Sequence, residues 1–137
     1  MNRPKLLTSL AVLIVFIFIL NFLANKFYWY YTVWHFDMIM HFLGGFWIGL
    51  LVLYFLATKV LSFGLVFKTL LIVLVVGIGW EIFEILVNEV VAQNPLDFLD
   101  IASDIFFDVT GGVFAILYFS KRIMLHRVNG VHPRIEL

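Results

Sequence analysis

Four long apolar stretches restrict the possible folds of this chain more than any other feature of its sequence. They cover about residues 6–24, 37–57, 69–91 and 104–119. A helix of about 20 residues is what a hydrocarbon layer of about 30 Å requires. A segment inside lipid must satisfy its own backbone hydrogen bonds, so each stretch is predicted to be a transmembrane α-helix. The last stretch is the shortest, and its helix can begin earlier, within 96–103. We therefore expect an all-α bundle of four transmembrane helices that forms a single domain over 1–137.

The composition excludes a soluble domain. Hydrophobic residues make up 64% of the 137 residues and charged residues 13%, which is about half of the charged fraction typical of soluble domains. A soluble chain of this length could not bury so much apolar surface, because small domains leave much of their surface in water. The absence of cysteine rules out disulfides and thiolate metal sites. A net charge of zero provides no basic field, so no nucleic-acid partner is expected.

Basic residues predict the orientation of the chain in the membrane. Of nine Lys and Arg, eight lie before the first span, between the second and third spans, or in the tail 120–137; only Lys26 lies on the other side. An excess of basic residues marks the cytoplasmic side. We therefore expect cytoplasmic N and C termini, a basic cytoplasmic tail, and a multi-pass protein surrounded by the lipids of a bacterial or archaeal inner membrane. The aromatic cluster 28–34 is then expected at the outer interface, where Trp and Tyr are enriched.

Ionisable residues occur in three of the four predicted spans, where they are costly and usually face the interior of a bundle. Neighbours within each set are three or four residues apart, so the members of a set share one helical face. Given the predicted orientation, the residues inside the spans all lie in the outer half of the membrane, and we expect them to converge there. In chain order the sets are Asp37 and His41, Glu81 and Glu84, and Asp97, Asp100, Asp104 and Asp108.

A group of carboxylates in lipid needs compensation, so it either takes up protons or recruits a cation. The three spans that hold these acids contain no Lys or Arg, which leaves protons, His41 or a bound metal. Carboxylates with an imidazole ligate metals in helical bundles, and this ligand set suits Mg²⁺, Mn²⁺, Fe²⁺ or Zn²⁺. Asp37 and His41 are the candidate catalytic residues, as general bases. The predicted ligands of the divalent metal ion are His41, Glu81, Glu84, Asp104 and Asp108.

Structural roles compete with these functional roles. Asp37 can cap its helix, because the helix dipole favours a carboxylate at the N-terminus. His41 can make a structural hydrogen bond, and Asp97 and Asp100 are expected in water or among lipid headgroups. The first span carries no ionisable residue, so we expect it at the periphery of the bundle.

Glycines accompany the polar residues in the second, third and fourth spans. Small residues let membrane helices approach closely, so these glycines are expected to hold the three helices together around the polar cluster. They are Gly44, Gly45, Gly77, Gly79, Gly111 and Gly112.

Three short elements carry a resemblance to a known family. Segment 37–45 contains Asp-x-x-x-His-Phe-x-Gly-Gly, and it is similar to an element of the VanZ-like and YjdF-like bacterial membrane proteins. Segment 79–84, Gly-Trp-Glu-Ile-Phe-Glu, resembles their Glu-x-x-Glu or Glu-x-x-Gln element. Segment 103–112, Ser-Asp-x-x-x-Asp-x-x-Gly-Gly, resembles their final element and matches the YjdF-like version better. VanZ-like proteins are associated with low-level glycopeptide resistance, but this chain lacks the Arg often found between their second and third elements.

Three functions remain open at this point. The first is a membrane enzyme, a metal-dependent hydrolase or transferase, that acts on a lipid-linked or cell-envelope substrate at the outer leaflet. The second is a non-catalytic module in which a cation or a carboxyl network fixes the helices. The third is a small proton- or cation-coupled transporter, which the apolar segments 60–67 and 70–76 disfavour because no polar residue continues the path. A homo-oligomer is compatible with all three.

Overall fold

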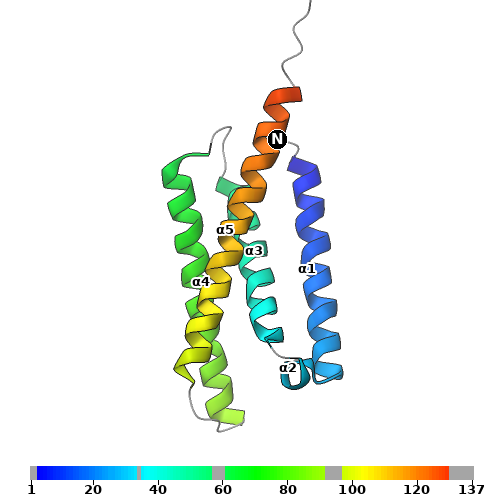
Figure 1. The fold of residues 1–137 in the computed structure, drawn as a ribbon, viewed down its shortest axis with the longest axis vertical. Helices are drawn as coiled ribbons and strands as arrows, with labels where there is room; N and C mark the ends of the chain where they lie inside the picture. Colours follow the sequence, from blue (N-terminus) through cyan, green and yellow to red (C-terminus); the bar gives the residue numbers. More distant parts are fainter. Residues whose placement is uncertain (1–2, 34, 57–60, 92–96, 130–137) are drawn as a thin grey trace, which may run out of the picture.

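The structure, a computed structural model, describes the backbone of residues 3–33, 35–56, 61–91 and 97–129 and the side chains of 4–33, 35–56, 61–87 and 97–121. All regular structure in these ranges is helical (Figure 1). The helices are α1 (Arg3–Lys26), α2 (Trp29–Thr32), α3 (Phe36–Leu56), α4 (Phe63–Val91) and α5 (Phe98–Asn129).

Four of these helices are long and apolar enough to cross a membrane, which confirms the predicted all-α fold with four transmembrane helices. Their membrane-spanning parts are Pro4–Lys26, Phe36–Leu56, Phe63–Val87 and Phe98–Lys121. The predicted tail 120–137 is helical as far as Asn129, and its remainder, 130–137, lies outside the described residues.

Helix α4 begins earlier than predicted, at Phe63 instead of near residue 69, and α5 begins at Phe98, within the segment 96–103 where an earlier start was expected. Side-chain caps account for both starts. Oγ of Ser62 accepts a hydrogen bond from the backbone N–H of Leu65 at 3.2 Å, and Oδ1 of Asp97 accepts one from the N–H of Leu99 at 3.0 Å. A cap satisfies backbone donors that a helix end leaves free, so Ser62 and Asp97 favour helix starts at these positions.

The one-turn helix α2 was not predicted from the sequence. It lies between Tyr28 and His35, whose φ angles of 58° and 60° are in the left-handed region, where residues other than glycine are uncommon. These two residues allow the chain to turn back from the end of α1 to the start of α3 (Figure 1).

The tightest helix pair is α3 with α5, and glycines make this contact possible. A Cβ atom on Gly45 would collide with the backbone carbonyl of Asp108, and one on Gly111 would collide with the carbonyl of Phe42. The predicted role of the glycines is therefore confirmed at these two positions. It is wrong for Gly44 and Gly79, where an added Cβ would meet no atom within 4 Å.

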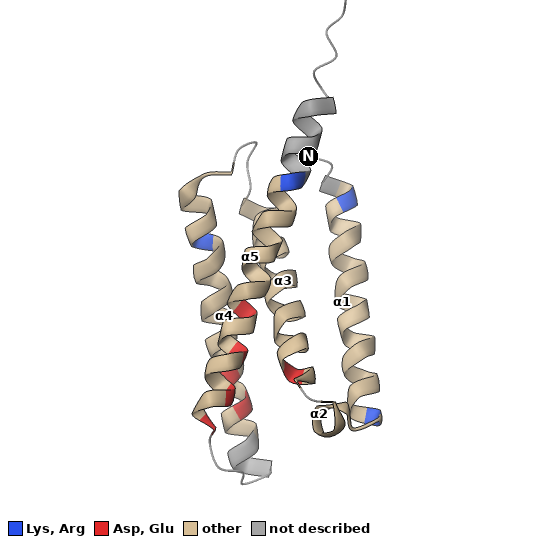
Figure 2. Ribbon diagram, in the orientation of Figure 1, with Lys and Arg blue, Asp and Glu red and all other residues tan. Residues whose placement is uncertain are grey.

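The bundle has an apolar half and an acidic half. Near the N-terminus of α1, buried apolar side chains from α1, α3, α4 and α5 form one cluster. Trp47 joins α1 to this cluster through a hydrogen bond from Nε1 to the carbonyl of Leu10 at 2.9 Å. The described Asp and Glu residues lie in the other half (Figure 2). The apolar cluster consists of Leu6, Leu10, Leu50, Leu53, Leu65, Ala115, Ile116 and Phe119.

Helix α1 is peripheral, as predicted. Within the described residues, its backbone approaches those of α2 and α3 and not those of α4 and α5. The polar half of the bundle is therefore built by α3, α4 and α5.

Candidate metal centre

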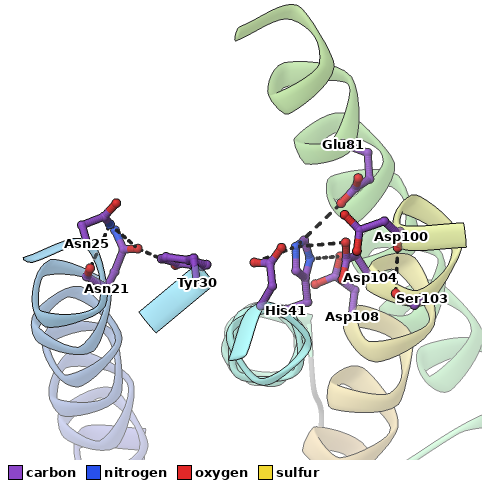
Figure 3. A network of polar contacts seen from close by, with 10 residues as sticks. Asn21, Asn25, Tyr30, His41, Glu81, Asp100, Ser103, Asp104 and Asp108 are labelled. Carbon is purple, nitrogen blue, oxygen red and sulfur yellow. Dashed lines mark hydrogen bonds and ion pairs between the residues drawn. The ribbon is translucent and has the colours of Figure 1, made fainter. Parts of the chain in front are cut away.

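His41 lies at the centre of a group of carboxylates that come from three helices (Figure 3). It projects from α3, one turn after Asp37, and only 6% of it is exposed. Glu81 reaches it from α4, and Asp104 and Asp108 reach it from α5; these three are 4%, 2% and 6% exposed. Glu84 completes the group, because one of its oxygens lies within 4.8 Å of ligand atoms of His41 and Glu81. The acidic cluster is defined here as Asp37, His41, Glu81, Glu84, Asp104 and Asp108.

The two ring nitrogens of His41 have different surroundings. Nδ1 lies 3.3 Å from Oδ2 of Asp108, within hydrogen-bonding distance. A carboxylate that is ionised only accepts hydrogen bonds, so this contact fits a His41 whose Nδ1–H donates to Asp108. Nε2 lies 3.8 Å from Oε1 of Glu81, 3.9 Å from Oδ1 of Asp37 and 4.0 Å from Oδ2 of Asp104. These three separations are too long for direct hydrogen bonds.

Two oxygens of the acidic cluster are buried without a hydrogen-bond partner among the described residues: Oε1 of Glu81 and Oδ1 of Asp104. Buried polar atoms in folded proteins are nearly always paired, so an unpaired oxygen calls for an explanation such as a bound ion or a proton. Among the described residues, the Lys positions on the ribbon lie apart from those of the acids of the cluster (Figure 2). Nζ of Lys26 lies over the ring of Phe27.

The geometry brings together two sets of three residues that could each hold a metal ion. Asp37, His41 and Asp104 form one set, and His41, Glu81 and Glu84 form the other; within each set the ligand atoms lie within 4.8 Å of one another. Four of the five predicted ligands and the predicted base Asp37 thus converge. Asp108, the fifth predicted ligand, lies on the Nδ1 side of His41 and in neither set.

Two members of the acidic cluster are partly exposed. The side chain of Asp37 is 39% exposed, whereas that of His41 is 5% exposed. Glu84 is half-buried. Asp97 and Asp100 are exposed, as predicted, and Asp97 caps α5. A molecule that approaches the cluster would therefore meet Asp37 and Glu84 first.

Gly77 belongs to the site, although the sequence suggested only a role in helix packing. A Cβ atom on Gly77 would lie 2.5 Å from Oδ2 of Asp108, the oxygen that binds His41. This glycine of α4 therefore makes room for the Asp108 carboxylate. Its position one turn before Glu81 on the same helix was the available signal, because residues four apart share a face.

Tyr30 of α2 links the end of α1 to the start of α3, the helix that carries Asp37 and His41. Its hydroxyl donates to Oδ1 of Asn21 at 2.7 Å, and its ring packs edge-on against Phe36 with the centroids 5.2 Å apart. Burial and then the charges of Asp37 and Glu84 raise the pKa of Tyr30 to about 12, so its phenol is neutral at ordinary pH. Sequence reasoning placed this residue only in an interfacial aromatic cluster.

Comparison with curated proteins finds no match for this chain, and comparison with solved structures finds none either. The sequence model of a family described as predicted membrane protein (DUF2238) matches residues 2–124. This match covers most of the chain, including α3, α4 and the residues of the acidic cluster. The chain therefore belongs to the family of predicted membrane proteins DUF2238.

Proposed function

We propose that this protein is a multi-pass membrane protein that binds a divalent cation in its acidic cluster and uses it to act on a lipid-linked or cell-envelope substrate at the outer leaflet. One observation carries the proposal. Nε2 of His41 faces carboxylates from three helices, and two of their oxygens, on Glu81 and Asp104, are buried without a partner.

The distances around Nε2 suit a cation between the nitrogen and the oxygens. A divalent ion such as Zn²⁺ binds imidazole nitrogen and carboxylate oxygen at about 2.0–2.2 Å each. An ion on the line between the two atoms would thus separate them by roughly 4.2 Å. The observed separations from Nε2 of 3.8 Å to Glu81 and 4.0 Å to Asp104 match an ion slightly off that line. Mg²⁺, Mn²⁺, Fe²⁺ and Zn²⁺ all accept this set of ligands.

Asp108 has a different part in this proposal from the other acids. A histidine that binds a metal through one nitrogen usually donates its other N–H to a carboxylate, which fixes the ring orientation and the tautomer. The contact of 3.3 Å between Nδ1 of His41 and Asp108 has this form. We therefore assign Asp108 to positioning His41, and assign metal binding to Asp37, Glu81, Glu84 and Asp104 together with His41.

The distribution of charge supports an outward-facing site. The described Lys residues lie mostly toward the end of the bundle that carries the N-terminus of α1, and the acids lie toward the other end (Figure 2). The positive-inside rule then places both termini in the cytoplasm and the acidic cluster toward the outside. The resemblance of segments 37–45, 79–84 and 103–112 to VanZ-like and YjdF-like proteins supports a bacterial or archaeal cell membrane.

The partial exposure of Asp37 and Glu84 supports catalysis. A catalytic metal keeps one position free for water or substrate, and there it polarises an oxygen or activates water. Asp37, whose Oδ1 lies 3.9 Å from Nε2 of His41, would bind the ion through that oxygen and could take a proton from such a water through its other oxygen. Substrate would enter past Asp37 from the level of the lipid headgroups.

A non-catalytic role is the second candidate, and the position of Glu81 favours it. The contact of α3 with α4 is less extensive than its contact with α5. Glu81 of α4 has a buried oxygen without a partner among the described residues, and this oxygen lies 3.8 Å from Nε2 of His41. A cation there would hold α4 to the other two helices. Transport is the third candidate, and it is disfavoured because the apolar cluster that includes Leu53 and Phe119 fills the other half of the bundle.

Metal analysis of the purified protein tests the proposal. The protein in detergent is analysed by elemental mass spectrometry as isolated and after dialysis against Mn²⁺, Zn²⁺ or Mg²⁺. We expect a bound divalent metal in the native chain and in Asp100→Asn, the matched control on an exposed turn of α5. We expect a strong loss of metal in Asp104→Asn. A native protein without metal under all conditions would refute the proposal.

A second experiment separates catalysis from a structural role. Proteoliposomes containing the native protein are incubated with a total lipid extract of the source cells, with and without a chelator, and the lipids are followed by mass spectrometry. An enzyme should change one lipid species in a chelator-sensitive way, and Asp104→Asn should abolish this change. A metal-bound protein that changes no lipid, and that loses thermal stability with chelator, would be the non-catalytic module.

A further inference from the structure

We infer that the acidic cluster holds two divalent cations in each chain. The inference rests on the proposed function, since it requires that the cluster binds metal. It starts from the two sets of ligands, which share only His41. The first set, the α5 triad (Asp37, His41 and Asp104), joins α3 to α5. The second set, the α4 triad (His41, Glu81 and Glu84), joins α3 to α4.

His41 can serve only one ion. Its Nδ1 is occupied by the hydrogen bond to Asp108, and Nε2 of a neutral imidazole has a single lone pair. An ion on Nε2 lies close to one oxygen each of Glu81, Asp37 and Asp104, so a second ion would be held by carboxylates alone.

Each triad contains one of the two buried oxygens without a partner. Oδ1 of Asp104 belongs to the α5 triad, and Oε1 of Glu81 belongs to the α4 triad. The two residues are 2% and 4% exposed, so bulk water does not reach these oxygens. An ion on Nε2 would pair with Oε1 of Glu81, but the oxygen of Asp104 that faces Nε2 is Oδ2. Oδ1 of Asp104 would still lack a partner, and a second ion accounts for it.

The charge of the cluster leads to the same conclusion. Its five carboxylates leave a formal charge of about −3 after one divalent cation binds and about −1 after two. Uncompensated charge is costly in a protein surrounded by lipid, and no described Lys or Arg lies within the cluster. The carboxylates are those of Asp37, Glu81, Glu84, Asp104 and Asp108.

Two ions fit what such ligands do in other helical bundles. Paired metal sites in four-helix proteins use carboxylates and histidines that project inward from facing helices, and their ions lie about 3.5–4 Å apart. A pair of ions would specify the proposed function further, because one ion can hold an oxygen of the substrate while the other holds a water.

The test uses Mn²⁺ as the probe and the full-length protein in detergent. Elemental analysis after removal of free metal should give two Mn²⁺ per chain. Electron paramagnetic resonance should show a spin-coupled pair in place of the hyperfine pattern of isolated Mn²⁺. Both measurements are made on the native chain, so the main result does not depend on the folding of a variant.

Variants at the half-buried positions locate the two ions. Asp37→Asn removes a ligand from the α5 triad only, and Glu84→Gln removes one from the α4 triad only. Each should reduce the content to one Mn²⁺ per chain and abolish the spin coupling. Asp100→Asn, an exposed acid on α5 outside both triads, should retain two coupled ions.

The possible results distinguish a failure of the proposed function from a failure of the two-ion inference. A native chain without Mn²⁺ would overturn both the proposed function and this inference. One Mn²⁺ per chain with the signal of an isolated ion would overturn the inference and leave the proposed function in place. Two uncoupled ions that persist in Asp37→Asn and in Glu84→Gln would also overturn it, because the ions would then lie outside the triads.

Discussion

The two ring nitrogens of His41 have different neighbours, and they therefore have different roles in the proposed site. Its Nδ1 faces a single carboxylate at hydrogen-bonding distance, that of Asp108, while its Nε2 faces three carboxylates at 3.8–4.0 Å. In the proposed metal site, the first contact would orient the ring and favour a proton on Nδ1. Nε2 would then bind the ion together with the carboxylates that it faces.

Replacement of Asp108 tests the positioning role. Asp108→Ala removes the acceptor for Nδ1–H, and we expect the affinity for Mn²⁺ to fall by about 10–100-fold, as for other carboxylates that orient a metal-bound histidine. Asp108→Asn should retain more of the affinity, because the amide oxygen can still accept the hydrogen bond. Affinity is measured by competition with a chelator.

The metal content at saturation distinguishes positioning from ligation by Asp108. If Asp108 only positions His41, Asp108→Asn should bind the same number of Mn²⁺ ions at saturation as the native chain. Asp100→Ala provides the control for the loss of an acid from α5. If Asp108→Asn lowered the number of ions at saturation, Asp108 would be a ligand, as the sequence suggested.

The contact between α3 and α5 is the element on which the site depends, because α3 carries Asp37 and His41 and α5 carries Asp104 and Asp108. The two backbones approach each other at Gly45. Adjacent glycines in the same sequence motif therefore have different importance: Gly45 is buried against α5, and Gly44 has open space around the position of a Cβ.

This difference predicts opposite effects of two neighbouring substitutions. Gly45→Ala should lower the free energy of unfolding by about 1–3 kcal/mol, because the added methyl group overpacks the helix contact. Gly44→Ala should be neutral or should stabilise the protein by up to about 1 kcal/mol, because alanine favours a helix more than glycine does. Unfolding in a denaturing detergent, followed by circular dichroism, measures both. Equal effects would contradict the assigned contact.

Helix α2 contributes stability that depends on pH. The pKa of Tyr30 is raised from its ordinary value of 10.0 to about 12, so the folded protein favours the neutral phenol. This contribution is complete below about pH 10 and is lost as the pH rises toward 12. We expect the melting temperature of the native chain to exceed that of Tyr30→Phe at pH 8, and this difference to shrink between pH 10 and 12.

Tyr31→Phe is the matched control for this measurement. Tyr31 is the next residue on α2 and is 89% exposed, so the loss of its hydroxyl should change the melting temperature little at any of these pH values. The difference in melting temperature between the native chain and Tyr30→Phe could instead stay constant up to pH 12. That result would show that the neutral phenol of Tyr30 does not stabilise the fold.

At the scale of the whole molecule, an apolar half and an acidic half are stacked along the bundle. The apolar cluster includes Leu6, Leu53 and Phe119, and the acidic cluster lies toward α2. Both ends of the chain's helical part, the start of α1 and the end of α5, lie at the apolar end (Figure 1). This arrangement allows both termini to lie on one side of a membrane and the site to open on the other.

Single cysteines test the orientation directly, because the natural chain has none. In intact cells, a membrane-impermeant maleimide should label Lys26→Cys at the end of α1 near the site. It should label Lys5→Cys and Lys121→Cys only after the membrane is made permeable. The labelled fraction is read by a mass shift on a gel. The reverse pattern would place the acidic cluster in the cytoplasm and would exclude a substrate in the outer leaflet.

Much of the fold and the membership of the site were accessible without the structure. The number of spans follows from apolar length, because the thickness of the hydrocarbon layer imposes it on every helix. The grouping of Glu81 with Glu84 and of Asp104 with Asp108 follows from helical periodicity. The start of α4 was predicted too late, because the predicted span began after the charged Lys68, although residues 63–67 are apolar.

The sequence by itself determined the class of the molecule and the chemistry of its polar residues, since both depend on local composition and on the period of a helix. Only the tertiary structure decided which of these residues contacts Nδ1 of His41 and which of them face Nε2. The sides of His41 that Asp108 and Glu81 occupy depend on the lateral register of three helices. That register is set by backbone contacts at Gly45 and Gly111, between residues far apart in the chain, and no local pattern encodes it.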